Sequence, residues 1–231
     1  MKITCISASN VEMARRNSAS TRVCEMIGDI LLEEKGIEAD VQIIPLLDYD
    51  LTPCRMCGDC YETGRCIRDE AFNHIYRELT FSDGIFIVCP HYAPIPSKLM
   101  MILEKLEEMV YLNWCANPNY HFTLHKKPVG IIAHGRQTKE ALPYYKTALL
   151  DPIAMALGSV QMEVLGVDEQ WPNGVAFGVT SISQREDSIF VTIEHDWEDV
   201  RQRVTPLVEN VTSVIARAAQ TEDYENGPVT L

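Results

Sequence analysis

The sequence has no run of lysine or arginine residues and no long apolar stretch. Its 20 basic residues are outnumbered by 33 acidic ones, which gives a formal net charge of -13. A nucleic-acid-binding protein normally carries a basic patch, so we expect no nucleic-acid partner. The opening MKITCISASN has one lysine and an apolar run too short for a secretion signal, and no apolar run approaches a membrane span. We therefore expect a cytoplasmic protein without a membrane partner.

Internal repeats and low-complexity linkers are also absent. A chain of 231 residues with 46% hydrophobic content can bury one sizeable core. We expect a single domain over residues 1–220. A C-terminal extension is expected to begin within it at about residue 168, and a frayed polar tail covers 221–231.

Short apolar runs alternate with stretches of helical periodicity. The expected strands are 2–7, 39–46, 84–90, 128–135 and 159–167. The expected helices are 18–35, 70–80, 97–112 and 138–157. This alternation predicts an α/β fold with a parallel sheet and right-handed crossovers. Beyond it we expect a β-pair formed by 175–182 and 188–196, and then a final helix over 197–219.

The loop after the first expected strand is rich in hydroxyl and amide side chains. In open α/β sheets, ligands bind at the carboxyl ends of the strands. This loop also leads into a helix N-terminus, where unpaired N–H groups favour an anion. The candidate phosphate-binding residues here are Ser9, Arg16, Asn17, Ser18, Ser20 and Thr21. The loop has no glycine, which excludes both the GxGxxG fingerprint and the P-loop. Ordinary helix capping by these residues is the alternative.

Two further loops follow expected strands at the same edge of the sheet. Prolines stiffen the loop 90–99, and its His91 and Tyr92 suit a flat aromatic ligand. A plain rigid connection is the alternative. In the loop 133–140, Gly135 allows the backbone to approach a ligand closely, and His134 is either a ligand contact or a structural histidine.

Four of the eight cysteines lie within thirteen positions, as C-x2-C-x2-C-x5-C. They are Cys54, Cys57, Cys60 and Cys66. In a reducing compartment, clustered cysteines are more often metal ligands than structural disulfides. Thiolates select iron–sulfur clusters or zinc, and three successive C-x2 steps with a nearby fourth cysteine suit a [4Fe–4S] cubane. A zinc site, and disulfides or free thiols, remain alternatives.

These motifs together resemble a known family. Their order is the Ser/Arg/Asn-rich loop, CRMCGDCYETGRCIRDE, SDGIFIVCPHYAPIPSKLMMILEKL and KKPVGIIAHG. It resembles the iron–sulfur flavoproteins of the NAD(P)H-dependent FMN reductase group, over residues 1 to about 167. The resemblance implies a flavodoxin-like five-stranded sheet of order 2-1-3-4-5 with helices on both faces. Residues 11–15 are an apparent insertion, and 171–196 has no counterpart.

The resemblance also implies the cofactors and their residues. FMN phosphate would be held by Ser9, Arg16, Asn17, Ser18 and Ser20. The isoalloxazine ring would be bordered by Pro90, His91, Tyr92, Ala93, Pro94, Ile95 and Pro96, and approached by His134 and Gly135. The four clustered cysteines would bind a [4Fe–4S] cluster, which air can destroy. The chain would form a homodimer or homotetramer, in which the cluster of one subunit lies near a flavin of another.

The expected function is electron transfer between a donor and an acceptor through the flavin–cluster pair. Ferredoxin and NAD(P)H are candidate donors. No side chain is needed as an acid or base, so no catalytic residue is named. One alternative is a NAD(P)H-dependent FMN or quinone reductase with zinc or no metal at the cysteines. The other is a non-catalytic redox sensor or zinc-stabilised binding module.

Overall fold

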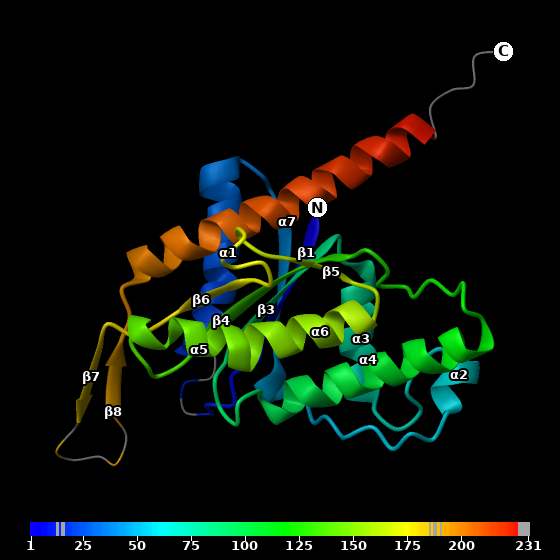
Figure 1. Cartoon of the computed structure of the whole chain (residues 1–231), viewed down its shortest axis with the longest axis horizontal. Helices are drawn as coiled ribbons and strands as arrows, with labels where there is room; N and C mark the ends of the chain where they lie inside the picture. The colour runs from blue at the N-terminus through cyan, green and yellow to red at the C-terminus, as the bar shows by residue number, and fades with distance from the viewer. Residues whose placement is uncertain (13, 15–16, 185, 187–188, 190, 226–231) are drawn as a thin grey trace.

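The structure is a computed structural model that describes residues 1–12, 14, 17–184, 186, 189 and 191–225. Five strands form the parallel core of one sheet, in the order β2-β1-β3-β4-β5 (Figure 1). They are β1 (Lys2–Ser7), β2 (Asp40–Pro45), β3 (Gly84–Pro90), β4 (Pro128–His134) and β5 (Glu163–Leu165). This confirms the doubly wound, flavodoxin-like order that the family resemblance implies.

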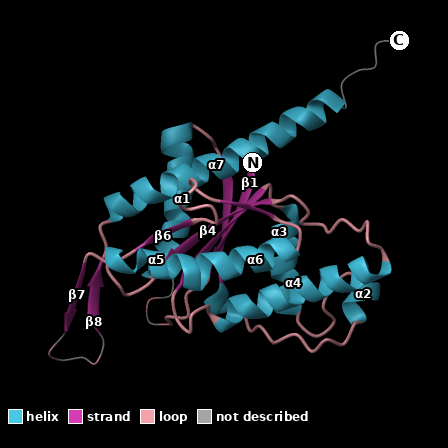
Figure 2. Ribbon diagram, viewed as in Figure 1, coloured by secondary structure: helices cyan, strands magenta, loops and turns pink. Residues whose placement is uncertain are grey.

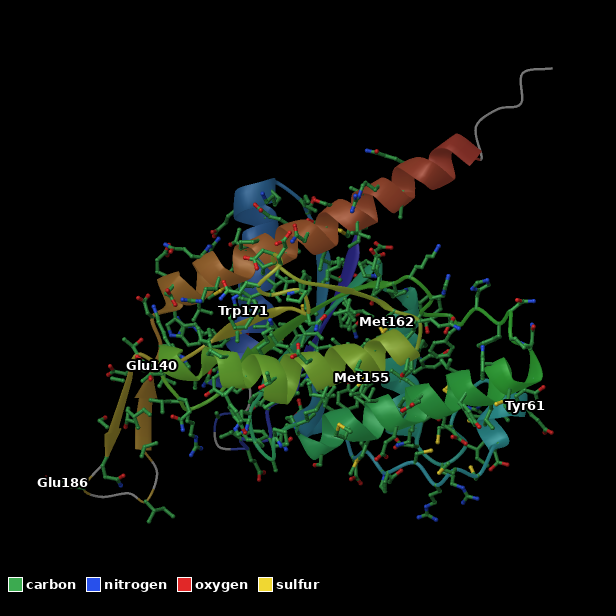
Figure 3. All side chains as sticks on the ribbon, in the orientation of Figure 1. Tyr61, Glu140, Met155, Met162, Trp171 and Glu186 are labelled. Carbon is green, nitrogen blue, oxygen red and sulfur yellow. The ribbon has the colours of Figure 1, made fainter. Side chains whose placement is uncertain are left out.

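Helices cover both faces of the sheet, as Figure 2 shows. One layer is formed by α1 (Ala19–Lys35) and α7 (Trp197–Glu225), which bury a core against β1, β3 and β4. The other layer is formed by α3 (Glu70–Phe81), α4 (Ser97–Ala116), α5 (Leu142–Tyr145) and α6 (Asp151–Ser159). Every residue of β3 and β4 is buried, as expected for central strands between two helical layers. None of the described helices is long and apolar enough to cross a membrane.

The C-terminal β-pair differs from the sequence prediction. The segment expected as one strand at 175–182 divides into β6 (Val175–Phe177) and β7 (Ser181–Gln184). β6 joins the main sheet and pairs parallel to the end of β4, beyond the short β5. β7 instead pairs antiparallel to β8 (Val191–Glu194), and this hairpin projects from the body (Figure 2). The burial explains the division, because β6 is fully buried whereas β7 is exposed throughout.

Two helical regions also differ from the prediction. The expected helix 138–157 consists of a 3-10 turn at Lys139–Ala141, α5, a π-helical turn at Lys146–Leu150 and α6. Pro152 lacks the N–H that a regular α-helix would require at that point, which is consistent with the widened turn before it. The short helix α2 (Asp59–Thr63) within the cysteine segment has no apolar periodicity and was not predicted.

Candidate functional site

A cavity of about 650 Å³ opens at the carboxyl edge of the sheet, between α1, the loops after β1, β3 and β4, and the β8–α7 junction. Cofactor sites typically enclose about 300–1,000 Å³. Eight of the residues that the sequence analysis assigned to FMN line this cavity: Ser9, Asn17, Ser18, Pro90, His91, Tyr92, His134 and Gly135. The topology therefore brings the three predicted loops to one site.

The first loop presents part of its predicted set to this cavity. Ser18 begins α1 as its N-cap, and its hydroxyl accepts a hydrogen bond from the Thr21 N–H at 3.2 Å. Ser9 is buried at the cavity wall, whereas Asn17 is exposed there. Arg16 lies outside the described residues. The helix-capping alternative is therefore confirmed at Ser18, and because Ser18 also lines the cavity, phosphate binding there stays a prediction.

Ser20 and Thr21 face inward and do not line the main cavity. The Ser20 hydroxyl lies 2.8 Å from His134 Nε2. The Thr21 hydroxyl lies 2.9 Å from Ser7 Oγ and 3.0 Å from Ser18 Oγ, and Thr21 lines only a smaller neighbouring pocket with Pro45. Their hydroxyls already have protein partners, so their contribution to the site is to fix the loop.

The loop after β3 is connected to the loop after β1 through Tyr92. Its hydroxyl accepts a hydrogen bond from the Asn10 N–H at 3.1 Å and lies 3.5 Å from Ser9 Oγ. His91 N–H donates to the His134 carbonyl at 2.7 Å, which connects the β3 loop to β4. The rest of the predicted ring-bordering set lies on the outer side of Tyr92. Ala93, Ile95 and Pro96 line a separate shallow pocket there, and Pro94 is exposed.

Packing within the protein largely explains why His134 and Gly135 occur at the end of β4. His134 stacks on Phe177 with ring centroids 4.9 Å apart, and burial, with the nearby His195, lowers its pKa to about 3. His134 is therefore a neutral hydrogen-bonding residue at physiological pH. A Cβ at position 135 would collide with the Tyr145 ring, so the glycine there is required by this close approach within the protein.

Nine cavity-lining residues were not predicted from the sequence. Three lie on or beside the first loop, and six lie elsewhere: Val11, Ala14, Ala19, and then Arg22, Arg136, Ile193, Glu194, His195 and Trp197. Arg22 lies over the Trp197 ring, with its guanidinium carbon 3.9 Å from the ring centroid. The sequence indicated no role for the segment 171–196. In the structure, the C-terminal end of this segment forms part of the cavity wall. No local motif signals this, because the wall forms only when folding brings the β8–α7 junction next to Arg22 on α1.

His195 is held within that wall. Its Nδ1 lies 3.3 Å from the Gly178 carbonyl, and its ring packs between Phe177 and Trp197 with centroids 5.5 and 4.9 Å away. A carbonyl can only accept, so Nδ1 carries the proton. Burial lowers the pKa of His195, and the charge of Arg22 adds to this effect. Two cationic side chains and two neutral histidines therefore surround the cavity, together with Glu194.

The four clustered cysteines line a second cavity, beneath α4 and separate from the first. All four are free thiols, which argues against the disulfide alternative in this structure. The Met56 N–H donates to Cys54 Sγ at 3.4 Å, and Met56 itself has a φ of 49°. Gly58 and Gly64, with φ of 78° and 65°, flank α2. These left-handed residues turn the segment, and all four cysteines are among the residues that line the one cavity.

Side chains from α3 and α4 hold both ends of the cysteine segment. At the first end, Asp69 accepts hydrogen bonds from Thr52 N–H at 2.9 Å and from its hydroxyl at 3.0 Å. Asp69 also pairs with Lys105 at 3.0 Å, with side chains only 1% and 3% exposed, and Lys105 donates to the Thr52 carbonyl. Burial alone would raise the pKa of Asp69, but the N–H groups of Thr52 and Phe72, with Lys105, outweigh it and lower the pKa.

At the second end, Asn73 contacts Cys66 in both directions. Its Oδ1 accepts from the Cys66 N–H at 2.9 Å, and its Nδ2 donates to the Cys66 carbonyl at 2.7 Å. Glu104 accepts from the Cys54 N–H at 3.3 Å at the other end. The first and last cysteines are therefore anchored through their backbones.

The donor set of this second cavity suits a thiolate-bound metal group. Four cysteines are among the residues that line it, and a backbone N–H already donates to one sulfur, as happens around metal-bound thiolates. Across the described part of the chain, however, no three metal-ligating side chains converge closely enough to hold an ion. Burial, followed by the charge of Glu108, raises the pKa of the Cys60 thiol to about 11, so a bound metal would have to displace its proton.

Comparisons with known proteins agree with this architecture. Residues 1–163 match the family described as NADPH-dependent FMN reductase. The chain is 30% identical over 109 residues to an iron-sulfur flavoprotein of Methanosarcina thermophila, covering 46% of this chain and 52% of the relative. It is 29% identical over 75 residues to an iron-sulfur flavoprotein of Methanocaldococcus jannaschii, covering 32% and 38%. The chain thus spans about half the length, or less, of these curated relatives.

A solved oxidoreductase from Corynebacterium diphtheriae has the same fold, with a TM-score of 0.58 at 14% identity, covering 94% of this chain and 97% of that one. The family match spans well over half of the chain. The chain therefore belongs to the NADPH-dependent FMN reductase family, a family of flavin-dependent oxidoreductases.

Proposed function

We propose that this chain is an oxidoreductase that binds FMN in the cavity at the sheet edge and a [4Fe–4S] cluster at the cysteine segment. It would pass electrons between a donor and an acceptor through these two groups. The observation that supports the proposal is that one chain has a cofactor-sized cavity formed by the three predicted loops and a second cavity lined by four free cysteines.

The residues of the first cavity would position the flavin. The first turn of α1, with Ser9, Ser18 and the charge of Arg22, would bind the phosphate. His91, Tyr92 and Trp197 would border the ring, while neutral His134 keeps the edge of β4 in place. When bound, FMN supplies the ability to take up two electrons and to release them singly. The protein's part is to hold and orient it and to exclude water.

The residues of the second cavity would hold the cluster. Cys54, Cys57, Cys60 and Cys66 are the four thiol donors that a cubane requires. The names of the two curated relatives, both iron-sulfur flavoproteins, support this choice over zinc. The two cavities share no lining residue within one chain. This is consistent with a homodimer or homotetramer that brings the cluster of one subunit to the flavin of another.

Replacing Cys57 by Ser tests whether the two sites are separate. Cys57 is the most accessible thiol of the four, so the change should leave the fold intact. We expect the variant to lose the cluster and keep FMN, measured as iron content and flavin absorbance of anaerobically purified protein. Cys115→Ser is the matched control, because Cys115 is also exposed but lies outside the segment. Loss of FMN from a folded Cys57→Ser variant would contradict the proposal.

A second candidate is a NAD(P)H-dependent FMN or quinone reductase with zinc or no metal at the cysteines. The specific observation in its favour is that the cavity lined by the four cysteines has a volume of only about 30 Å³, which is too small for four irons and four sulfides in this conformation. Rapid reduction of the bound flavin by NAD(P)H in the Cys57→Ser variant would support this candidate. Reduction that requires the intact cysteine segment would support the flavin–cluster carrier.

A further inference from the structure

Polar side chains from α3 and α4 form hydrogen bonds to both ends of the cysteine segment. Asn73, in the first turn of α3, forms two hydrogen bonds to the backbone of Cys66. Glu104 and the Lys105–Asp69 pair, on α4 and at the start of α3, hold Cys54 and Thr52. Both helices are packed against the main core. Hydrogen bonds from their side chains therefore restrict the backbone positions of Cys54 and Cys66.

The middle of the segment lacks such contacts. Cys57 is exposed, and the described hydrogen bonds of α2 run within the segment, such as Thr63 to the Asp59 carbonyl at 2.8 Å. Cys54 and Cys66 are therefore anchored. Cys60 lies on the short helix α2 between two left-handed glycines, and Cys57 directly precedes the first of them. In a site of this kind the first and last thiols have fixed positions before a metal binds. The two middle thiols can move to complete the coordination.

We propose that Asn73 is a positioning residue of the metal site: its paired hydrogen bonds to Cys66 hold the fourth thiol in its binding position before metal arrives. Lys105 and Asp69 do the same at the first end, by fixing Thr52 two residues before Cys54. The inference rests on the proposed metal-binding function of the cysteine segment. It assigns to these residues a role in metal affinity beyond their contribution to folding.

The test uses Co²⁺ as the probe, because thiolate–Co²⁺ absorption reports binding without any enzyme assay. Full-length metal-free protein is titrated anaerobically with Co²⁺, and FMN affinity and thermal unfolding are measured on the same samples. Loss of an outer-sphere partner typically weakens a metal site by about 10- to 100-fold. We expect Asn73→Ala to weaken Co²⁺ binding by that factor while FMN affinity is unchanged.

Gln161→Ala is the matched control. Gln161 also holds a loop in both directions, accepting from Phe122 N–H at 2.8 Å and donating to the Tyr120 carbonyl at 3.0 Å, but it does not line the cysteine cavity. It should lose thermal stability and keep Co²⁺ affinity within about twofold of the parent, well below the factor expected for Asn73→Ala. Lys105→Met, compared with Lys98→Met on the same helix, repeats the test at the first end. Lys98 donates to three carbonyls around Leu46 and touches no cysteine.

The outcomes separate the two claims. If the parent protein binds no Co²⁺ through its thiols, the proposed metal site is wrong, and the inference with it. If the parent binds Co²⁺ and Asn73→Ala binds it equally well, only the positioning role is overturned. Should Lys105→Met fail to fold, the Asn73 and Gln161 pair still decides the matter.

Discussion

Ser20 Oγ and His134 Nε2 lie 2.8 Å apart in the interior, where they join the first turn of α1 to the end of β4. Both residues were expected to contact FMN. Their mutual hydrogen bond and the stacking of His134 on Phe177 hold Ser20 behind the cavity wall, while His134 remains one of the residues that line the cavity. The pair fixes the relative position of two loops that the cofactor would use.

His134 makes folding stability depend on pH. Burial lowers its pKa from the usual 6.5 to about 3. As the pH falls below 6.5 the unfolded chain takes up a proton at this imidazole, whereas the folded chain does not until about pH 3. Stability is therefore present above pH 6.5 and lost as the pH falls towards 3.

His134→Gln should lose less stability on acidification than the parent, measured as the free energy of urea unfolding at a series of pH values across that range. His121→Gln removes an exposed imidazole and serves as the control. If both variants lose stability in parallel with the parent, His134 is not the group responsible.

Ser20 and His134 also show which features of the site can be predicted from the sequence and which cannot. The hydroxyl-rich loop, the Pro-stiffened loop and His134 were correctly placed at one edge of the sheet, because each follows an apolar strand. The direction of each side chain was not predictable, since Ser20 on α1 meets His134 only after folding. Likewise, Arg22 and Trp197 are far apart in sequence but in contact in the structure. The hairpin that precedes Trp197 contains no motif that predicts this contact.

Tyr92 offers a test of the flavin cavity. Its hydroxyl accepts a hydrogen bond from the Asn10 N–H and so joins the loops after β1 and β3. Tyr92→Phe removes this bond, which is worth about 0.5–1.5 kcal/mol and corresponds to roughly a 2- to 13-fold loss. We expect FMN affinity, measured by flavin fluorescence quenching, to fall by that factor. Tyr111→Phe changes an exposed ring on α4 and should have no effect. Equal FMN affinities in both variants would remove Tyr92 from the cavity's function.

A variant at Arg22 tests whether this residue binds the phosphate of FMN or its ring. It lies in the first turns of α1 and lines the cavity together with Ser18. Arg22→Gln should weaken the binding of FMN and leave riboflavin, which has no phosphate, unchanged. Dissociation constants for both flavins give the answer, with Arg77→Gln as a surface control. An equal loss for FMN and riboflavin would mean that Arg22 acts through Trp197 on the ring instead.

The Lys105–Asp69 pair predicts a large effect on stability. Removing one partner of a buried ion pair costs about 3–5 kcal/mol, because the other charge is left unpaired. Lys105→Met should therefore destabilise the chain by that amount, measured by urea unfolding at neutral pH. Adding Asp69→Asn to it should recover part of the loss, since the buried charge disappears while an acceptor for the Thr52 N–H remains. A double variant less stable than Lys105→Met alone would contradict this account.

The central claim is that one chain holds both FMN and an iron–sulfur cluster. The most direct measurement is a visible spectrum of anaerobically purified protein, with iron, sulfide and zinc counted on the same sample. The account predicts flavin bands with a broad shoulder beside them, and about four irons and four sulfides per chain, as a cubane requires. Flavin bands accompanied by zinc, or by no metal, would contradict it and leave a simple flavin reductase with unused thiols at Cys54 to Cys66.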